Sequence, residues 1–293
     1  MSELEWVTPD IELRAPVMVL ALEGLFDAAE AATNALTWLQ TNRPVETVAA
    51  VDPDGFFDFA TNRPTVSIVD GRRVLGWQQN EFVALRDSAA QHDLVVLHGI
   101  EPDVRWQTFV DLVVEVIERT GCEFVATVGA FPEPVPHTRT PFVFGSTSNS
   151  ALAARLGLSR PQYQGPTGIV GVLTQRLDSM GLPTVALRVG VPHYLTNARH
   201  PRSTLALLRH LEHVLGFPTH HELLEDEVQQ WQALHDRAVG TDAQAEAFVR
   251  MLEDEFDRRA EAMVTSGEDL GRAFEEFLRE HRGDGDAEDP EAP

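Results

Sequence analysis

Apolar runs alternate with amphipathic stretches through the first two thirds of the chain. Near-continuous runs such as Val17–Leu20 and Leu94–Leu97 are typical of strands that are covered on both faces. The candidate strands are Pro16–Leu22, Thr47–Val51, Thr65–Val69, Arg73–Trp77, Leu94–His98, Glu123–Val128 and Thr184–Val189. Between the third and fourth of these, the sequence Asp70-Gly71-Arg72 predicts the turn of one antiparallel hairpin.

Apolar positions spaced three and four apart predict helices between these strands. The candidate helices are Asp27–Gln40, Val104–Thr120, Ile169–Met180 and Thr204–Leu215, and the second of them ends at Gly121, a helix C-terminal signal. Strands that alternate with helices indicate an α/β domain. We therefore expect a mostly parallel sheet flanked by helices.

From Thr219 onward the pattern becomes purely helical. Leu224, Val228 and Trp231 begin an apolar stripe that recurs as far as Phe277, while Asp and Glu crowd the opposite faces. The pattern predicts three short helices, broken at Gly240 and near Gly267, which form an acidic helical appendage. The expected domains are residues 1–218 (α/β), 219–281 (helical appendage) and 282–293 (disordered acidic tail).

The charge balance narrows the range of partners. The 293 residues carry 46 acidic and 23 basic side chains, a formal charge of −23, and all of the basic ones are arginine. A field of this sign repels polyanions, so nucleic acid and anionic membrane are poor partners. The lack of lysine excludes a P-loop and Schiff-base chemistry.

The sequence also gives expectations for the localisation of the protein, for its cysteine and for metal or cofactor binding. No apolar run is long enough to cross a bilayer and the N-terminal residues lack the basic region of a signal peptide, so we expect a cytoplasmic protein. Cys122 is the single cysteine, which allows no intrachain disulfide and indicates a buried thiol. The pairs His210/His213 and His220/His221 lack an obvious third ligand, and we expect neither a metal nor a cofactor.

Polar residues gather in the loops that follow predicted strands. These loops lie along one edge of a parallel sheet, where ligands bind. The candidate pocket residues are Glu23, Gly24, Asp27, His137, Thr138, Arg139, Tyr163, Gly165, Thr167, Gly168, His193 and Tyr194. In one interpretation, Arg139 and the amides before Ile169 hold a phosphate or carboxylate and a histidine moves a proton. In the other, these groups only cap backbone in proline-rich turns.

Several of these loops also carry a family resemblance. The motifs Glu23-Gly24 with Asp27–Ala32, Glu101-Pro102 with Arg105-Trp106, Pro136–Arg139, Tyr163–Ile169 and Val191–Tyr194 occur in this order. Together they resemble the proteasome assembly chaperone 2 family in its actinobacterial form. The likeness extends from about residue 15 to about residue 280.

The resemblance implies a nucleoside-phosphorylase-like α/β fold and a homo-oligomer, with a trimer suspected. Eukaryotic and archaeal relatives are linked to the assembly of the twenty-S proteasome. Some archaeal relatives end in a hydrophobic residue, then Tyr, then any residue, whereas this chain ends Glu291-Ala292-Pro293, so docking through such a tail is not expected.

Two functional hypotheses follow. In the first, the protein is a non-enzymatic, assembly-chaperone-like interaction protein whose protein partner is related to the proteasome. In the second, it is an enzyme or binding protein for a small anionic or nucleoside-like ligand in the candidate pocket. The residues leave the question of catalysis open, although the first hypothesis is preferred.

Overall fold

The structure is a computed structural model that describes residues 3–41 and 43–282, with side chains as far as residue 262. It divides the chain into two compact units, Met1–Asp236 and Arg237–Pro293. The first unit contains the α/β body. The predicted tail, 282–293, lies outside the described residues except for Arg282.

Within the described residues, eight strands form one sheet in the order β1-β3-β6-β7-β2-β8-β10-β9, and two more form a separate hairpin. The sheet strands are β1 (Leu4–Trp6), β2 (Val17–Glu23), β3 (Val45–Val51), β6 (Asn80–Leu85), β7 (Leu94–Ile100), β8 (Val125–Glu133), β9 (Val143–Ser146) and β10 (Thr184–Pro192). The four central strands β7, β2, β8 and β10 are parallel, while β1, β3, β6 and β9 add antiparallel flanks. The expected α/β fold, a mostly parallel sheet flanked by helices, is therefore confirmed, and the antiparallel flanks make the sheet mixed.

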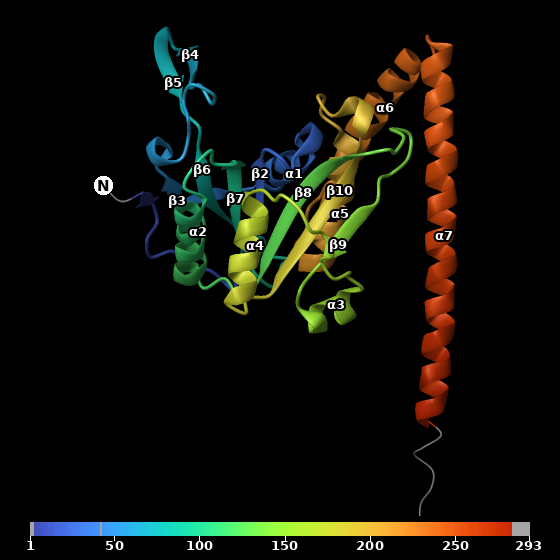
Figure 1. Ribbon diagram of the computed structural model, residues 1–293. Helices are drawn as coiled ribbons and strands as arrows, with labels where there is room; N and C mark the ends of the chain where they lie inside the picture. Colours follow the sequence, from blue (N-terminus) through green and yellow to red (C-terminus); the bar gives the residue numbers. More distant parts are fainter. Residues whose placement is uncertain (1–2, 42, 283–293) are drawn as a thin grey trace, which may run out of the picture. The chain divides into compact units, whose positions relative to one another are not determined.

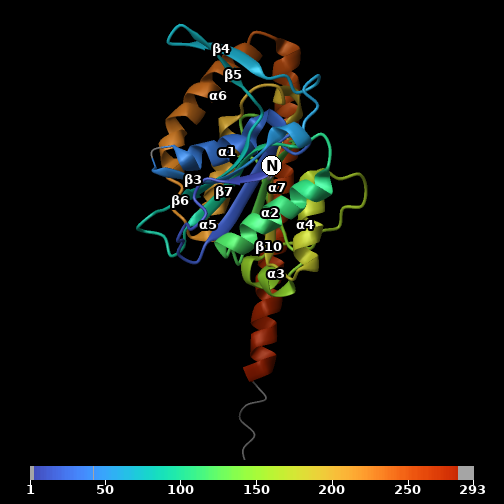
Figure 2. The ribbon, with the colours of Figure 1, turned by 90° about the vertical axis from the view of Figure 1, so that its left-hand side faces the viewer.

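Helices cover both faces of the sheet (Figures 1 and 2). The α-helices of the first unit are α1 (Ala31–Gln40), α2 (Trp106–Thr120), α3 (Ser150–Leu156), α4 (Ile169–Ser179), α5 (Pro201–Leu215) and α6 (Glu225–Val239), the last of which continues past Asp236. The 3-10 turns are η1 (Ala28–Glu30), η2 (Pro53–Gly55), η3 (His193–Leu195) and η4 (His221–Leu224). Helices α1 and α5 share one apolar core with the sheet, and α2 and α4 share the other.

Local signals explain where several of these helices begin and end. Gly121 ends α2 in the left-handed conformation, with φ 72°, as the sequence predicts. Helix α5 begins three residues earlier than expected because Pro201 is favoured in a first helical turn and the ring of His200 accepts a hydrogen bond from the Ser203 amide. Leu224 and Val228, assigned from the pattern to the appendage, belong to the core that α1 and α5 share with the sheet.

The predicted hairpin is present and stands apart from the main sheet. Strands β4 (Thr65–Val69) and β5 (Arg72–Gly76) pair with each other alone, and both views show them projecting from the body (Figures 1 and 2). The turn residues Asp70 and Gly71 have φ of 49° and 75°, the positive values that a tight two-residue hairpin turn requires. Every residue of the two strands is exposed.

The second unit contains one long helix, α7 (Ala243–Arg282). The expected break near Gly267 is therefore wrong: an interior glycine costs a helix only about 1 kcal/mol relative to alanine, which neighbouring helix-forming residues offset. Ion pairs between Glu246 and Arg250 and between Glu255 and Arg258 lie along its first turns. Among the described residues, no helix has the length and apolarity to span a bilayer.

Candidate functional site

The centre of the parallel sheet opens where ligands of α/β proteins usually bind. Strands β2 and β8 pair only from Met18–Leu20 to Val125–Thr127 and then separate toward their carboxyl ends. In this gap, Nη1 of Arg188 donates to the Thr127 carbonyl at 2.9 Å and Nη2 donates to the Thr127 hydroxyl at 3.1 Å. An arginine side chain from β10 thus bonds both the carbonyl and the hydroxyl of Thr127, the last residue of β8 that pairs with β2.

The segment that follows β2 lies over the same gap and bonds to β8 beyond the end of their strand pairing. The amide of Ala130 donates to the Phe26 carbonyl at 2.7 Å, and the Phe26 ring centroid lies 5.9 Å from Cζ of Arg188. Burial lowers the pKa of Arg188 to about 10, so it stays protonated at neutral pH. The chain itself therefore fills the switch point, where an α/β protein usually places its ligand.

Asp27 has a structural role beside this point. Its carboxylate accepts hydrogen bonds from the amides of Ala32 at 2.8 Å and Thr33 at 3.2 Å, and from the Thr33 hydroxyl at 2.5 Å. Burial is the main cause that raises its pKa. Asp27 caps α1 across the left-handed residues Ala29 and Glu30, so the helix begins at Ala31 rather than at the predicted Asp27.

A cleft of about 630 Å³ lies at the same edge of the sheet. Four predicted residues line it, together with side chains that follow β7 and precede α2. The lining residues are Glu23, Gly24, Leu25, Thr61, Asn62, Ile100, Glu101, Pro102, Asp103, Trp106, Thr167 and Gly168. We call it the acidic cleft, because its charged groups are the three carboxylates of Glu23, Glu101 and Asp103.

Glu101 occupies the helix N-terminus where the sequence predicts an anion. One carboxylate oxygen accepts from the Ile169 amide at 2.8 Å, and the other accepts from the Leu25 amide at 3.2 Å. A Cβ on Gly24 would lie 2.5 Å from this carboxylate, which explains the glycine there. The protein thus supplies its own anion to α4.

Glu23 is the exposed carboxylate at the end of β2 that faces the cleft. Its side chain makes no hydrogen bond or ion pair within the described part of the chain. Burial, then Asp27 and Glu30, raise its pKa. Asp103, by contrast, accepts from the Asn62 amide at 2.9 Å and from the Asp58 backbone at 2.7 Å. The cleft therefore favours a cation at Glu23 and disfavours an anionic ligand.

A second cluster contains other predicted residues. The ring of His137 is only 1% exposed, with Nδ1 at 2.8 Å from the Tyr194 hydroxyl and Nε2 at 3.1 Å from Oδ1 of Asp236. Because the Asp236 carboxylate accepts from Nε2–H, Nδ1 of the neutral ring carries no proton and accepts from the phenol. The His137 amide also donates to the phenol oxygen at 2.8 Å. Carboxylate, imidazole and phenol thus form one hydrogen-bonded chain.

Aromatic rings surround this cluster. Trp231 stacks on His235 with centroids 3.7 Å apart and meets the edge of His200 at 4.8 Å. The centroid of the His137 ring lies 6.2 Å from the ring centroids of both Trp231 and His235. Burial is the largest of the causes that lower the pKa of His200 to about 3. The arrangement attaches α6 to the loop after β8 and to the start of α5.

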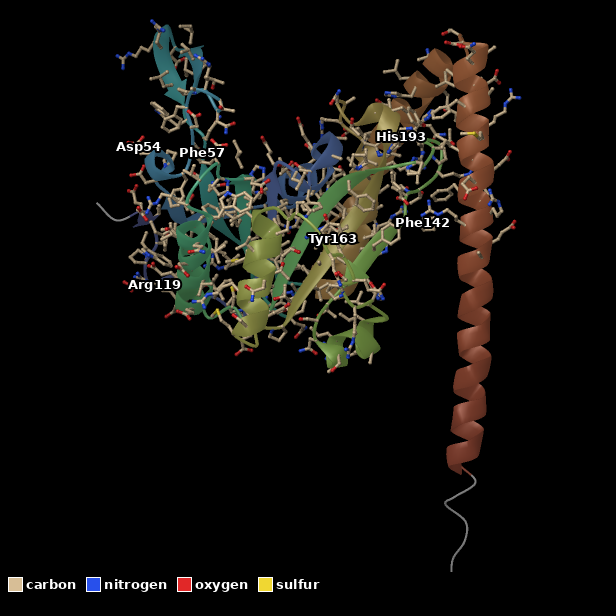
Figure 3. All side chains as sticks on the ribbon, viewed as in Figure 1. Asp54, Phe57, Arg119, Phe142, Tyr163 and His193 are labelled. Atoms are coloured by element: carbon tan, nitrogen blue, oxygen red, sulfur yellow. The ribbon has the colours of Figure 1, made fainter. Side chains whose placement is uncertain are left out.

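The residues predicted to form one pocket therefore lie in different parts of the structure. Glu23, Gly24, Thr167 and Gly168 line the acidic cleft, whereas His137, His193 and Tyr194 belong to the second cluster. Nη1 of Arg139 lies 3.4 Å from the Thr138 hydroxyl. Tyr163 is 72% exposed and donates to the Pro166 carbonyl, beside Gly165. Figure 3 shows Tyr163 well apart from His193.

The candidate residues chosen from the sequence did not include three that hold these sites together: Arg188 at the switch point, Asp236 in the second cluster and Glu101 in the acidic cleft. Arg188 lies inside a strand and Asp236 lies 99 residues from its partner His137, so neither has a local signal. Glu101, by contrast, lies in the Glu101-Pro102 motif of the family resemblance, which singles out this position. No group of three or more histidine, cysteine or carboxylate side chains suited to a metal occurs among the described residues.

Comparisons with known proteins agree with this fold. A family model described as the PAC2 family matches residues 21–239. A PAC2 family protein from Streptomyces avermitilis is 36% identical, covers 80% of this chain and 99% of its own, and has a TM-score of 0.74. A Mycobacterium tuberculosis proteasome-assembly chaperone homologue is 32% identical, with the same coverage and a TM-score of 0.72.

A Mycobacterium tuberculosis protein of unknown function is 28% identical, covers 90% of this chain and 92% of its own, and has a TM-score of 0.81. The search of curated proteins gave no significant match. The family model covers most of the chain, including both clusters. The family expected from the loop motifs is thus confirmed, and the chain belongs to the PAC2 family.

Proposed function

We propose that the protein is a non-enzymatic, chaperone-like interaction protein whose partner is related to the proteasome. The family supports this role, because a relative that is 32% identical over 80% of the chain is described as a proteasome-assembly chaperone homologue. The acidic body also favours a partner that presents a basic surface.

The filled switch point is the structural observation that carries the proposal. Phe26 and Arg188 occupy the gap between β2 and β8, and the Glu101 carboxylate occupies the N-terminus of α4. An enzyme that binds a small anion at this edge would need these positions open. Their occupation by the chain's own groups favours a protein that works through its surface.

The exposed hairpin supports self-association as part of this function. Strands β4 and β5 present five large apolar side chains to solvent, at positions 66, 68, 69, 74 and 75. A two-stranded hairpin is only marginally stable in water, and contiguous exposed apolar surface usually marks a protein contact. A homo-oligomer, with a trimer as the expected size, would cover it.

Reconstitution tests the chaperone role. The α- and β-subunits of the twenty-S proteasome from the same organism are mixed with and without the protein, and native gels follow half- and full-size particles. We expect faster formation of full particles and co-purification of the protein with an assembly intermediate. Unchanged assembly kinetics together with no binding to any subunit would refute the proposal.

The hydrogen-bonded chain of Asp236, His137 and Tyr194 is the one observation that favours a ligand-binding role. An oriented imidazole next to a phenol can transfer a proton. Native mass spectrometry of protein purified from its own host tests this alternative. A retained small molecule that is lost in Tyr194→Phe would support it, whereas a ligand-free protein in both forms would count against it.

A further inference from the structure

The hairpin differs from the rest of the chain in both polarity and charge. Ile68 is 66% exposed, and the neighbouring apolar side chains of both strands are also exposed. Residues 63–76 carry Arg63, Arg72 and Arg73 against one acid, Asp70, in a chain whose formal charge is −23. None of these three arginines has an ion-pair partner within the described residues. The hairpin is therefore a basic and apolar projection from an acidic body.

The acidic cleft has the complementary character. The Glu23 side chain lacks a partner among the residues that the structure describes, and repulsion from Asp27 and Glu30 contributes to its raised pKa. Leu25, in the wall of the cleft, is 62% exposed, and Val104, next to the lining residue Asp103, is also exposed. The cleft thus combines a concave shape, uncovered aliphatic side chains and a carboxylate suited to a cation.

The hairpin of the same chain does not fill this cleft. Residues 61 and 62, just before β4, line its rim, but the hairpin residues themselves are exposed to solvent. Both complementary surfaces nevertheless belong to one chain. A contact that joins two different surfaces of identical chains is heterologous, and it closes into a ring when the rotation between copies permits.

We propose that the β4–β5 hairpin of one copy docks in the acidic cleft of a second copy. The apolar side chains of the hairpin cover Leu25 and Val104, and Arg72 or Arg73 supplies a cation to Glu23. The inference rests on the proposed self-association and specifies its two surfaces. It agrees with a ring-shaped trimer, in which each copy gives one hairpin and receives another.

Charge reversal in the full chain tests the contact. Sedimentation velocity measures the mass of wild type, Arg72→Glu/Arg73→Glu, Glu23→Arg and the combined variant. We expect an oligomer for wild type, at least tenfold weaker association for each reversed surface, and recovery in the combined variant. Glu5→Arg, an exposed reversal outside the cleft, is the matched control and should leave the mass unchanged. Circular dichroism confirms that each variant is folded.

Disulfide trapping gives an independent readout that does not depend on charge. Arg73→Cys and Glu23→Cys are purified separately and mixed under mild oxidation. The native Cys122 does not interfere, because burial raises the pKa of its thiol to about 11. We expect a crosslinked pair that contains one chain of each variant. Two cysteines at Glu5 and Arg73 should give no such product.

Several outcomes would overturn the inference. They are a monomeric wild type, reversed variants that keep the wild-type mass, a combined variant that does not recover, and the absence of the mixed disulfide. A monomeric variant that still accelerates proteasome assembly would leave the proposed function intact. Conversely, a trapped oligomer that neither changes assembly kinetics nor binds a proteasome subunit would refute the function and not the contact.

Discussion

Strands β2 and β4 are both short and apolar, yet they lie in opposite environments. Five of the seven residues of β2 are buried, whereas all five residues of β4 are exposed. Strand β2 lies between β7 and β8 with helices on both faces, while β4 has only β5 beside it. The hydrophobic pattern thus predicts that a strand forms. What covers the strand depends on its neighbours, and among the described residues β4 pairs with β5 alone.

The largest expected loss of stability follows from truncating a side chain of the buried strand β2. Leu20 in β2 is fully buried, so Leu20→Ala should lower the free energy of unfolding by about 3 kcal/mol through lost burial and a cavity. The control is Leu223→Ala, which removes the same atoms from an exposed site and should cost less than about 0.5 kcal/mol. Urea titration measures both, and equal losses would contradict the assigned burial.

The next effect concerns a buried polar side chain. His200 stays neutral in the folded protein down to about pH 3, whereas in the unfolded chain the same imidazole has its ordinary pKa of 6.5. Stability is therefore lost as the pH falls below 6.5, by up to about 1.4 kcal/mol per unit. His200→Asn retains a helix cap and should flatten this slope, as followed by urea titration between pH 7 and pH 4.5. His213→Asn, on the exposed side of α5, is the control, and an unaltered slope in His200→Asn would reject the assignment.

A smaller effect is expected at the acidic cleft. Glu101→Gln keeps the shape, removes the charge that faces the N-terminus of α4 and sets an NH2 donor against one of the two backbone N–H groups, which together should cost about 1 kcal/mol. Thermal melting measures the loss against Glu118→Gln, an exposed change on α2. A more stable Glu101→Gln would show that relief of acidic repulsion in the cleft outweighs the helix contact.

The smallest change in stability is expected for a side chain of the exposed strand β4. Ile68→Ala in β4 should change the free energy of unfolding by less than about 0.5 kcal/mol at concentrations where copies do not associate, because the side chain is exposed. At higher concentration the loss should grow, since association stabilises the folded chain by mass action. A loss near 3 kcal/mol in the dilute protein would remove the contrast with Leu20.

Most core strands were predictable because each carries its own signal. Four apolar residues in succession predicted β2 and β7, and Gly121 marked the end of α2. Strand β6 begins with the polar Asn80 and Glu81, and β9 has only four residues, so neither gave a clear pattern. Their pairing with β7 and β10 is a long-range effect.

The candidate site was harder to predict than the fold. Sequence reasoning identified His137 and Tyr194, which do meet, but placed them in one pocket with Tyr163, which lies elsewhere. Strand order decides which loops converge, and no local pattern encodes it. The partners Asp236 and Arg188 are recognised only when distant segments have been brought together.

The isolated hairpin also bears on the life of a newly made chain. The main sheet can form without residues 65–76, because β4 and β5 pair only with each other. Each folded chain therefore keeps an exposed, basic and apolar hairpin in solvent, and exposed strands of this kind are prone to aggregation. If the proposed contact between copies forms, the rate at which newly synthesised copies meet decides whether this surface is covered or leads to aggregation.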